Sequence, residues 1–261
     1  MPILDLRGGT LLQAVGRERA EAWAAGYPAV RQDLLTQMLA LLAGAVGVPV
    51  RASECLTPLR WLLEHIADGV TANQGGRLPK ALVREANDRF GWSDGIGGTL
   101  KTDTDLPELA SLNELARRVR LITRKRRKVS LTARGRRALG DTSLLWCSVV
   151  AEVFSGGTCQ GEGAAVAAAT LAQARRPVPR STVQAMVRAA LVGRRPTGEA
   201  EMHEQWPSSD ASGNLGLLAD IFGWIEHDDD GQNRTWTLTS SGRQAALMGL
   251  QLQARTPRNC V

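Results

Sequence analysis

The chain has 261 residues, of which 43% are hydrophobic and 22% charged, and its net charge is +6. This composition is typical of a soluble globular protein and argues against a disordered one. The longest apolar stretch, residues 34–50, contains Thr36, Gln37 and Pro49, so it predicts a buried helix rather than a membrane span. The N-terminus lacks the basic-then-apolar order of a signal peptide. We therefore expect a cytoplasmic protein that does not contact a membrane.

The cysteines and histidines do not follow a metal-binding or catalytic pattern. The four cysteines show no CxxC spacing and the three histidines are scattered, so we expect free thiols and neither a metal nor a cofactor. Neither a nucleophile–base pair, nor a carboxylate pair, nor a phosphate-binding loop can be assembled from the chain. The sequence therefore predicts a protein that is not an enzyme.

In chain order, the spacing of apolar residues predicts an N-terminal helical segment (1–56) and two domains (57–142 and 143–261). Helices are expected at residues 11–26, 30–46, 57–67, 79–90, 108–119, 164–175, 179–192, 211–222 and 240–254, with a further helical run after Thr132 broken near Gly140-Asp141. Strand pairs are expected at 120–124 with 128–132 and at 224–227 with 234–239. Residues 155–163 read as a flexible connector.

An internal repeat links the two domains. The segment "LNELARRVRLITRKRRKVSLTARGRRAL" from Leu112 matches "LGLLADIFGWIEHDDDGQNRTWTLTSSGRQAAL" from Leu215. Leu131-Thr132 corresponds to Leu238-Thr239, and Gly135-Arg136 corresponds to Gly242-Arg243. The positions that match are of the core type. Those that differ are of the surface type, and their charge is inverted.

A helix that leads directly into a hairpin, followed by "LT-x-x-G-R" at the start of the next helix, resembles the end of a winged-helix (winged helix-turn-helix) domain. In that family the helix before the hairpin enters a groove of DNA and the hairpin forms the wing. The resemblance implies an α+β fold class, mainly α with small β-hairpins. It also implies two winged-helix-like domains in tandem, after the N-terminal helical segment.

Positive charge is concentrated in the first of these domains. Residues Arg117 to Arg137 include 11 Lys and Arg and no acid, so the remaining 240 residues have a net charge of −5 out of the total of +6. A concentrated positive face favours a polyanion over a solvated charge run or a nuclear-localisation signal. We expect double-stranded DNA as the partner, with helix 108–119 reading base edges and the wing 120–132 contacting phosphates or the minor groove. The candidate DNA-binding residues are Ser111, Asn113, Arg117, Arg118, Arg120, Arg124, Lys125, Arg126, Arg127, Lys128, Arg134, Arg136 and Arg137, with Glu114 on the same helix face.

The second domain has the opposite charge. Residues Glu199 to Asp230 include nine acids and no Lys or Arg, so phosphate would repel its wing, "EHDDDGQNR". We read the consecutive aspartates as a solvated turn rather than a Mg²⁺ site. This domain is expected to form a homodimer or to bind a protein partner.

The sequence thus predicts a DNA-binding protein, most simply a transcriptional regulator. The alternative is a non-catalytic tandem winged-helix subunit of a larger assembly. Such subunits are associated with chromosome-organising ATPases, and a bacterial defence system or mobile element could use one.

Overall fold

The computed structural model describes residues 46–73, 77–93, 101–155, 159–191, 216–229 and 234–255. The helices expected within residues 11–45 and the acidic residues Glu199, Glu201, Glu204, Asp210 and Asp230 lie outside these ranges. The described residues are mainly helical and carry two small antiparallel sheets of three strands each, which confirms the α+β class.

Most helices lie within two residues of the predicted bounds, except the start of α9. They are α3 (Ala52–Cys55), α4 (Thr57–Ile66), α5 (Lys80–Phe90), the 3₁₀ turn η1 (Asp103–Asp105), α6 (Pro107–Arg118), α7 (Ala133–Gly140), α8 (Thr142–Val153), α9 (Cys159–Gln173), α10 (Arg180–Leu191) and α12 (Ser240–Arg255). Residues 216–221 are also helical. The strands are β1 (Val70–Thr71), β2 (Ile122–Lys125), β3 (Lys128–Leu131), β4 (Val178–Pro179), β5 (Ile225–Asp229) and β6 (Arg234–Leu238).

The chain divides into two compact units. The first, which we call the basic unit, consists of Val48–Glu152 together with Gly216–Trp224. The second unit consists of Met1–Gly47, Val153–Leu215 and Ile225–Val261. The basic unit therefore includes residues 216–224, which the sequence-based boundary at residue 143 assigned to the second domain.

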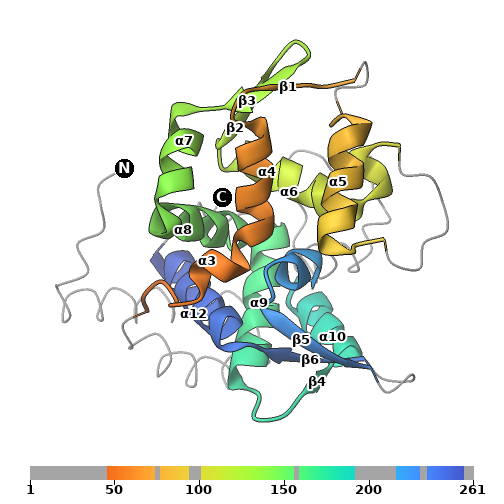
Figure 1. The fold of residues 1–261 in the computed structure, drawn as a ribbon. Helices are drawn as coiled ribbons and strands as arrows, with labels where there is room; N and C mark the ends of the chain where they lie inside the picture. Colours follow the sequence, from red (N-terminus) through yellow and green to blue (C-terminus); the bar gives the residue numbers. More distant parts are fainter. Residues whose placement is uncertain are drawn as a thin grey trace, which may run out of the picture. The chain divides into compact units, whose positions relative to one another are not determined.

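The basic unit has a sheet of strand order β1-β3-β2. Its hairpin pairs Ile122 with Leu131 and Lys125 with Lys128, and it projects beyond helices α4 and α7 (Figure 1). The sequence predicted this hairpin but not β1, which pairs with β3 at Val129 and Lys128. A strand of two residues is too short to show the alternation by which strands are recognised.

Leucines on α4 and α6 form the core of the basic unit. Leu59, Leu62 and Ile66 of α4 and Leu109 and Leu112 of α6 are fully buried. Their spacing of three, four and seven residues places them on one face of each helix. Burial of each such side chain contributes about 1.5–3 kcal/mol. The opposite face of α6 is therefore fixed in orientation and directed toward solvent.

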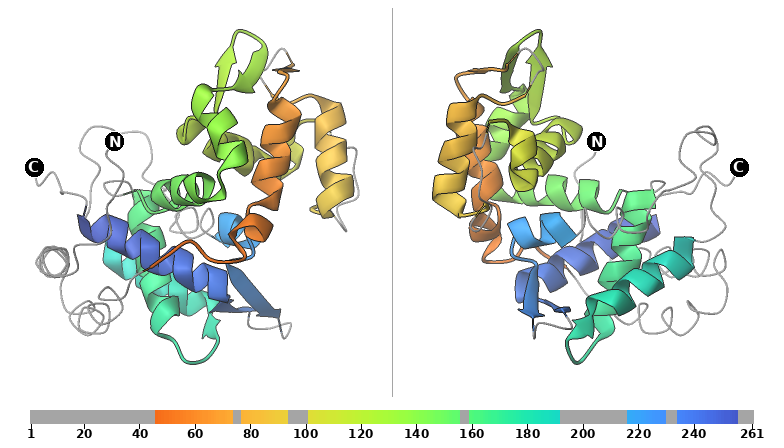
Figure 2. Two further views of the ribbon diagram at one scale, coloured as in Figure 1. Left: turned by 60° about the vertical axis from the view of Figure 1, so that its left-hand side comes forward. Right: turned by 90° about the vertical axis from the view of Figure 1, so that its right-hand side faces the viewer.

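The sheet of the second unit has the equivalent order, β4-β6-β5. Helix α9 packs against both α10 and α12 (Figure 2), and its residues 161–169 are all buried. Most of these residues are Gly or Ala, whose small side chains allow close packing on several sides. The predicted connector at 155–163 is therefore wrong in part, because α9 already begins at Cys159.

Candidate nucleic-acid interface

The junction between α6 and the hairpin has a defined geometry. The Leu121 N–H donates to the Ala116 carbonyl at 2.8 Å, and the Arg120 N–H donates to the Arg117 carbonyl at 3.0 Å. These two bonds form a Schellman motif, which requires a left-handed residue just after the helix. Arg120 is that residue, with φ of 58°. A non-glycine side chain in this conformation costs roughly 1–2 kcal/mol.

The same junction occurs in the matching part of the repeat. The Trp224 N–H donates to the Ala219 carbonyl at 2.7 Å, and the Gly223 N–H donates to the Asp220 carbonyl at 3.0 Å. Gly223 has φ of 60°. The repeat therefore extends to backbone conformation, and Arg120 corresponds to a glycine.

Thr132 joins this junction to the next helix. Its hydroxyl oxygen lies 2.6 Å from the Arg120 carbonyl and 3.1 Å from the Leu121 carbonyl, and it accepts a bond from the Gly135 N–H at 3.0 Å. Gly135 passes so close to the Leu121 carbonyl that a Cβ would collide with it. In the second unit, Thr239 accepts from the Gly242 N–H at 3.0 Å. The "LT-x-x-G" pattern is thus a helix cap in both copies.

Exposed Lys and Arg side chains cover three consecutive elements of the basic unit: α6, the hairpin and α7. We call this set the basic surface. Its members are Arg117, Arg118, Arg120, Arg124, Lys125, Arg126, Arg127, Lys128, Arg134, Arg136 and Arg137, and all are exposed. Such a concentration of one charge raises the local electrostatic potential and attracts anions.

Glu114 partly neutralises the α6 end of the basic surface. Its carboxylate lies 3.5 Å from Arg117 and 3.1 Å from Arg118. All three side chains are about half exposed, so each pair contributes only about 0.3–0.5 kcal/mol. Both arginines can exchange this partner for a phosphate at little cost.

Three other basic residues are held against the unit itself. The Arg127 Nε donates to the Ala72 carbonyl at 3.2 Å, and the Arg134 Nη2 donates to the Ser148 hydroxyl at 2.8 Å. The stem of Lys128 passes over Gly69, where a Cβ would collide with it. These contacts fix the hairpin and α7 rather than leave their basic side chains fully free.

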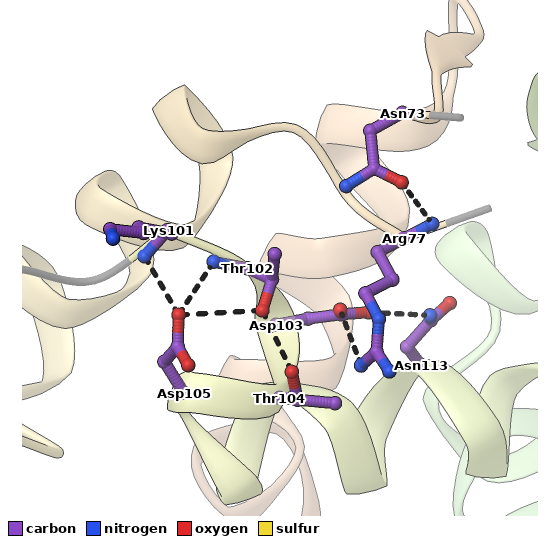
Figure 3. A network of polar contacts seen from close by, with 8 residues as sticks. All are labelled: Asn73, Arg77, Lys101, Thr102, Asp103, Thr104, Asp105 and Asn113. Carbon is purple, nitrogen blue, oxygen red and sulfur yellow. Dashed lines mark hydrogen bonds and ion pairs between the residues drawn. The ribbon is translucent and has the colours of Figure 1, made fainter. Parts of the chain in front are cut away.

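Asn113 has a structural partner rather than a free amide. The sequence predicted that Asn113 faces a DNA groove, but its side chain is half-buried and its Nδ2 donates to Asp103 Oδ2 at 3.3 Å (Figure 3). Asp103 is 5% exposed, and its other oxygen lies 3.9 Å from Arg77 Nη1. This network ties α6 to η1 and to Arg77. Ser111, the other polar candidate, is also half-buried.

The segment before α6 is ordered by a capping box. Thr102 and Asp105 form it, and the Asp105 carboxylate accepts bonds from the backbone N–H groups of Lys101 (2.8 Å) and Thr102 (2.9 Å). These bonds lower the pKa of Asp105. A threonine followed three residues later by an acid is a recognisable sequence signal for a helix cap.

The structure describes only some of the nine acids between Glu199 and Asp230. Asp220, Glu226 and Asp228 are exposed. The turn of the second hairpin, residues 230–233, and the acids before residue 216 lie outside the described residues.

Within the described ranges, His, Cys, Asp and Glu side chains do not gather in any group of three that could hold a metal ion. In the same ranges, every helix is too short or too polar to cross a membrane. Cys55 and Cys147 are free thiols.

Comparison of the chain with protein-family models, curated proteins and solved structures finds no match.

Proposed function

We propose that this chain is a DNA-binding protein, most simply a transcriptional regulator, and that the basic surface binds duplex DNA. The observation that carries the proposal is the gathering of eleven exposed Lys and Arg residues on three consecutive elements of one unit. Like charges held this close repel one another, so a polyanion that neutralises them gains free energy.

The topology supports a winged-helix-like unit. The order α4–β1–α5–α6–β2–β3, with a sheet of order β1-β3-β2, is that of a winged helix. The second unit contains α9, β4, α10, β5 and β6 with the corresponding sheet order, whereas the helical residues 216–221, which the repeat matches to the end of α6, belong to the basic unit. This agreement favours two winged-helix-like domains in tandem. By analogy with that fold, α6 would enter a groove and the hairpin would act as the wing.

The surface of the second copy makes it a poor ligand for phosphate. The repeat pairs Arg117 with Asp220 and Arg120 with Gly223, so the second copy lacks positive charge at both positions. Glu226 and Asp228 are exposed on its hairpin. We therefore infer that the second unit binds a protein, which is either another copy of this chain or a different partner. The same acidic residues favour the second candidate function, a non-catalytic subunit of a larger assembly.

The test compares two variants of equal net charge. One reverses Arg124, Lys125, Arg126 and Arg127 to Glu in the hairpin of the basic unit. The other reverses four exposed arginines of the second unit, Arg175, Arg176, Arg234 and Arg243. Binding to random-sequence duplex DNA is measured by fluorescence anisotropy at low salt.

We expect the hairpin variant to lose binding by at least about 100-fold, since about four phosphate contacts are lost. The control variant should lose far less. Equal binding by both variants would contradict the proposal. If the wild-type chain does not bind DNA and instead retains a stable protein partner, the subunit function is favoured.

A further inference from the structure

We propose that Arg120 and Arg126 are fixed phosphate contacts that grip one groove of duplex DNA from the two ends of β2, and that both are retained at a cost in stability. This inference rests on the proposed function. It goes further by assigning two specific residues, and by predicting that stability and DNA affinity respond to their loss in opposite directions.

Two arginines of the basic surface have a strained backbone conformation. Among the described residues, Arg120 (φ 58°) and Arg126 (φ 55°) are the non-glycine residues with positive φ. The others in this region of φ are Gly69, Gly91 and Gly223. Residues held in sparsely populated conformations cluster at functional sites, where a requirement other than stability keeps them. Both of these strained residues belong to the basic surface.

The matching position of the repeat has a glycine in place of Arg120. Gly223 occupies the position of Arg120, at φ of 60° and with the same two hydrogen bonds around it. The junction can therefore form with glycine. The geometry alone does not require an arginine at residue 120, which leaves the exposed guanidinium as the reason for it.

Arg126 is in an equivalent situation at the other end of β2. Lys125 pairs with Lys128, so Arg126 and Arg127 form a two-residue turn. When only the first residue of such a turn has positive φ, glycine is the usual choice. Neither Lys125 nor Lys128, the flanking basic residues, has positive φ. An arginine at residue 126 therefore adds one more charge to the turn at a cost in conformational free energy.

The separation of Arg120 and Arg126 suits the two edges of one DNA groove. Arg120 and Arg126 lie on either side of β2, six residues apart, and hence at most about 20 Å apart along an extended strand. A groove of duplex DNA is about 6–12 Å wide, so the two side chains can reach phosphates on its opposite edges. Among the described residues, neither side chain has an ion-pair partner. Both are exposed and available for an external anion.

The experiment uses the full chain and the variants R120G, R126G and the double variant. Each glycine should raise the midpoint of thermal unfolding, by about 2–4 °C. Each should weaken binding to duplex DNA about five- to tenfold at 0.1 M salt and lower the slope of log K against log salt by about 1. The double variant should combine both effects.

Matched controls separate strain from charge. G223R introduces the same strained arginine at the matching position of the repeat, which lies in the basic unit but outside the basic surface, so it should lower the unfolding midpoint without weakening DNA binding. R243A removes one exposed charge from the second unit and should change affinity less than twofold. R120N and R126N keep a residue that tolerates positive φ and should reproduce the loss of binding.

Two results would overturn the inference. If the glycine variants are more stable but bind DNA like the wild type, the arginines are not contacts. If they bind more weakly without any gain in stability, the strain argument is wrong. A wild type without salt-dependent affinity for DNA would instead defeat the proposed function itself, so the two failures are distinguishable.

Discussion

The geometry around the hairpin depends on close contact between the backbone of Gly135 and that of Leu121. Gly135 lies against the Leu121 carbonyl, and the hydroxyl of Thr132 bonds to the same junction. A side chain on residue 135 would have to displace backbone rather than the flexible end of another side chain. The arrangement of α6, the hairpin and α7 therefore depends on two uncharged residues, Thr132 and Gly135.

We predict that G135A destabilises the basic unit by about 2–3 kcal/mol, because the added Cβ collides with backbone. Gly140 offers a matched control, since a Cβ on it would meet no atom within 4 Å. G140A should be neutral or stabilising by up to about 1 kcal/mol. Urea unfolding of both variants measures the difference, and equal stabilities would show that Gly135 is not required.

The bond between Asn113 and Asp103 predicts the effect of removing the Asn113 amide. If its role is to hold Asp103, N113A should weaken binding to all DNA sequences by a similar factor, and should destabilise the unit by about 1–2 kcal/mol. If it reads a base, the loss would instead be confined to one position of the preferred site. Binding of N113A to a randomised duplex library distinguishes these outcomes.

The sequence could predict the apolar positions of α4 and α6 because they repeat at helical spacing. It could not predict the bond between Asn113 and Asp103, since that depends on how the segment before α6 folds back. The positive φ of Arg120 could not be predicted from the residue type, because arginine rarely adopts this conformation. The only sequence indication was the glycine, Gly223, at the matching position of the repeat.

At the scale of elements, both ends of α6 are held. Its N-terminal side follows η1 and the capping box, and its C-terminal end passes directly into the hairpin junction. A helix fixed in this way presents its exposed face in one orientation, which favours binding by lowering the cost of ordering. Strands β1 and β4 were not predicted because each has two residues.

Glu108 in the first turn of α6 gives a pH-dependent prediction. Burial raises the pKa of Glu108, and the nearby Asp220 contributes in the same direction. A raised pKa in the folded state means that the ionised carboxyl destabilises the fold. Stability should therefore fall as pH rises from the ordinary carboxyl value through the raised one.

E108Q should accordingly be more stable than the wild type at pH 7, by less than about 1 kcal/mol because the carboxyl is only half-buried. The two proteins should converge in stability near pH 4. Urea unfolding across this range measures the gap, and a gap that does not change with pH would contradict the assignment to Glu108.

Across the whole molecule, the two copies of the internal repeat have opposite charge, since the copy from Leu112 is basic and the copy from Leu215 is acidic. The repeat and the charge inversion could both be read from the sequence, because they concern residue types at matched positions. The division of the chain was less predictable. Residues 216–224 belong to the basic unit, although the repeat pairs them with the end of α6. Similarity between two segments of a sequence does not indicate against which hydrophobic core each segment packs.

The hairpin β5–β6, on which Glu226 and Asp228 are exposed, should weaken DNA binding by electrostatic repulsion of phosphate. We predict that E226K/D228K increases affinity for duplex DNA by a few-fold at low salt, and that the gain disappears above about 0.5 M salt because screening removes it. A loss of affinity in this variant would indicate instead that Glu226 or Asp228 supports the DNA-binding form of the protein.

The most direct test of DNA binding by the basic surface is the salt dependence of wild-type binding to random-sequence duplex DNA. If about five or six members of the basic surface meet phosphates, log K should fall linearly with log salt with a slope of about −4 to −6. A slope near zero, or no binding at 50 mM salt, would contradict the assignment of the basic surface to DNA.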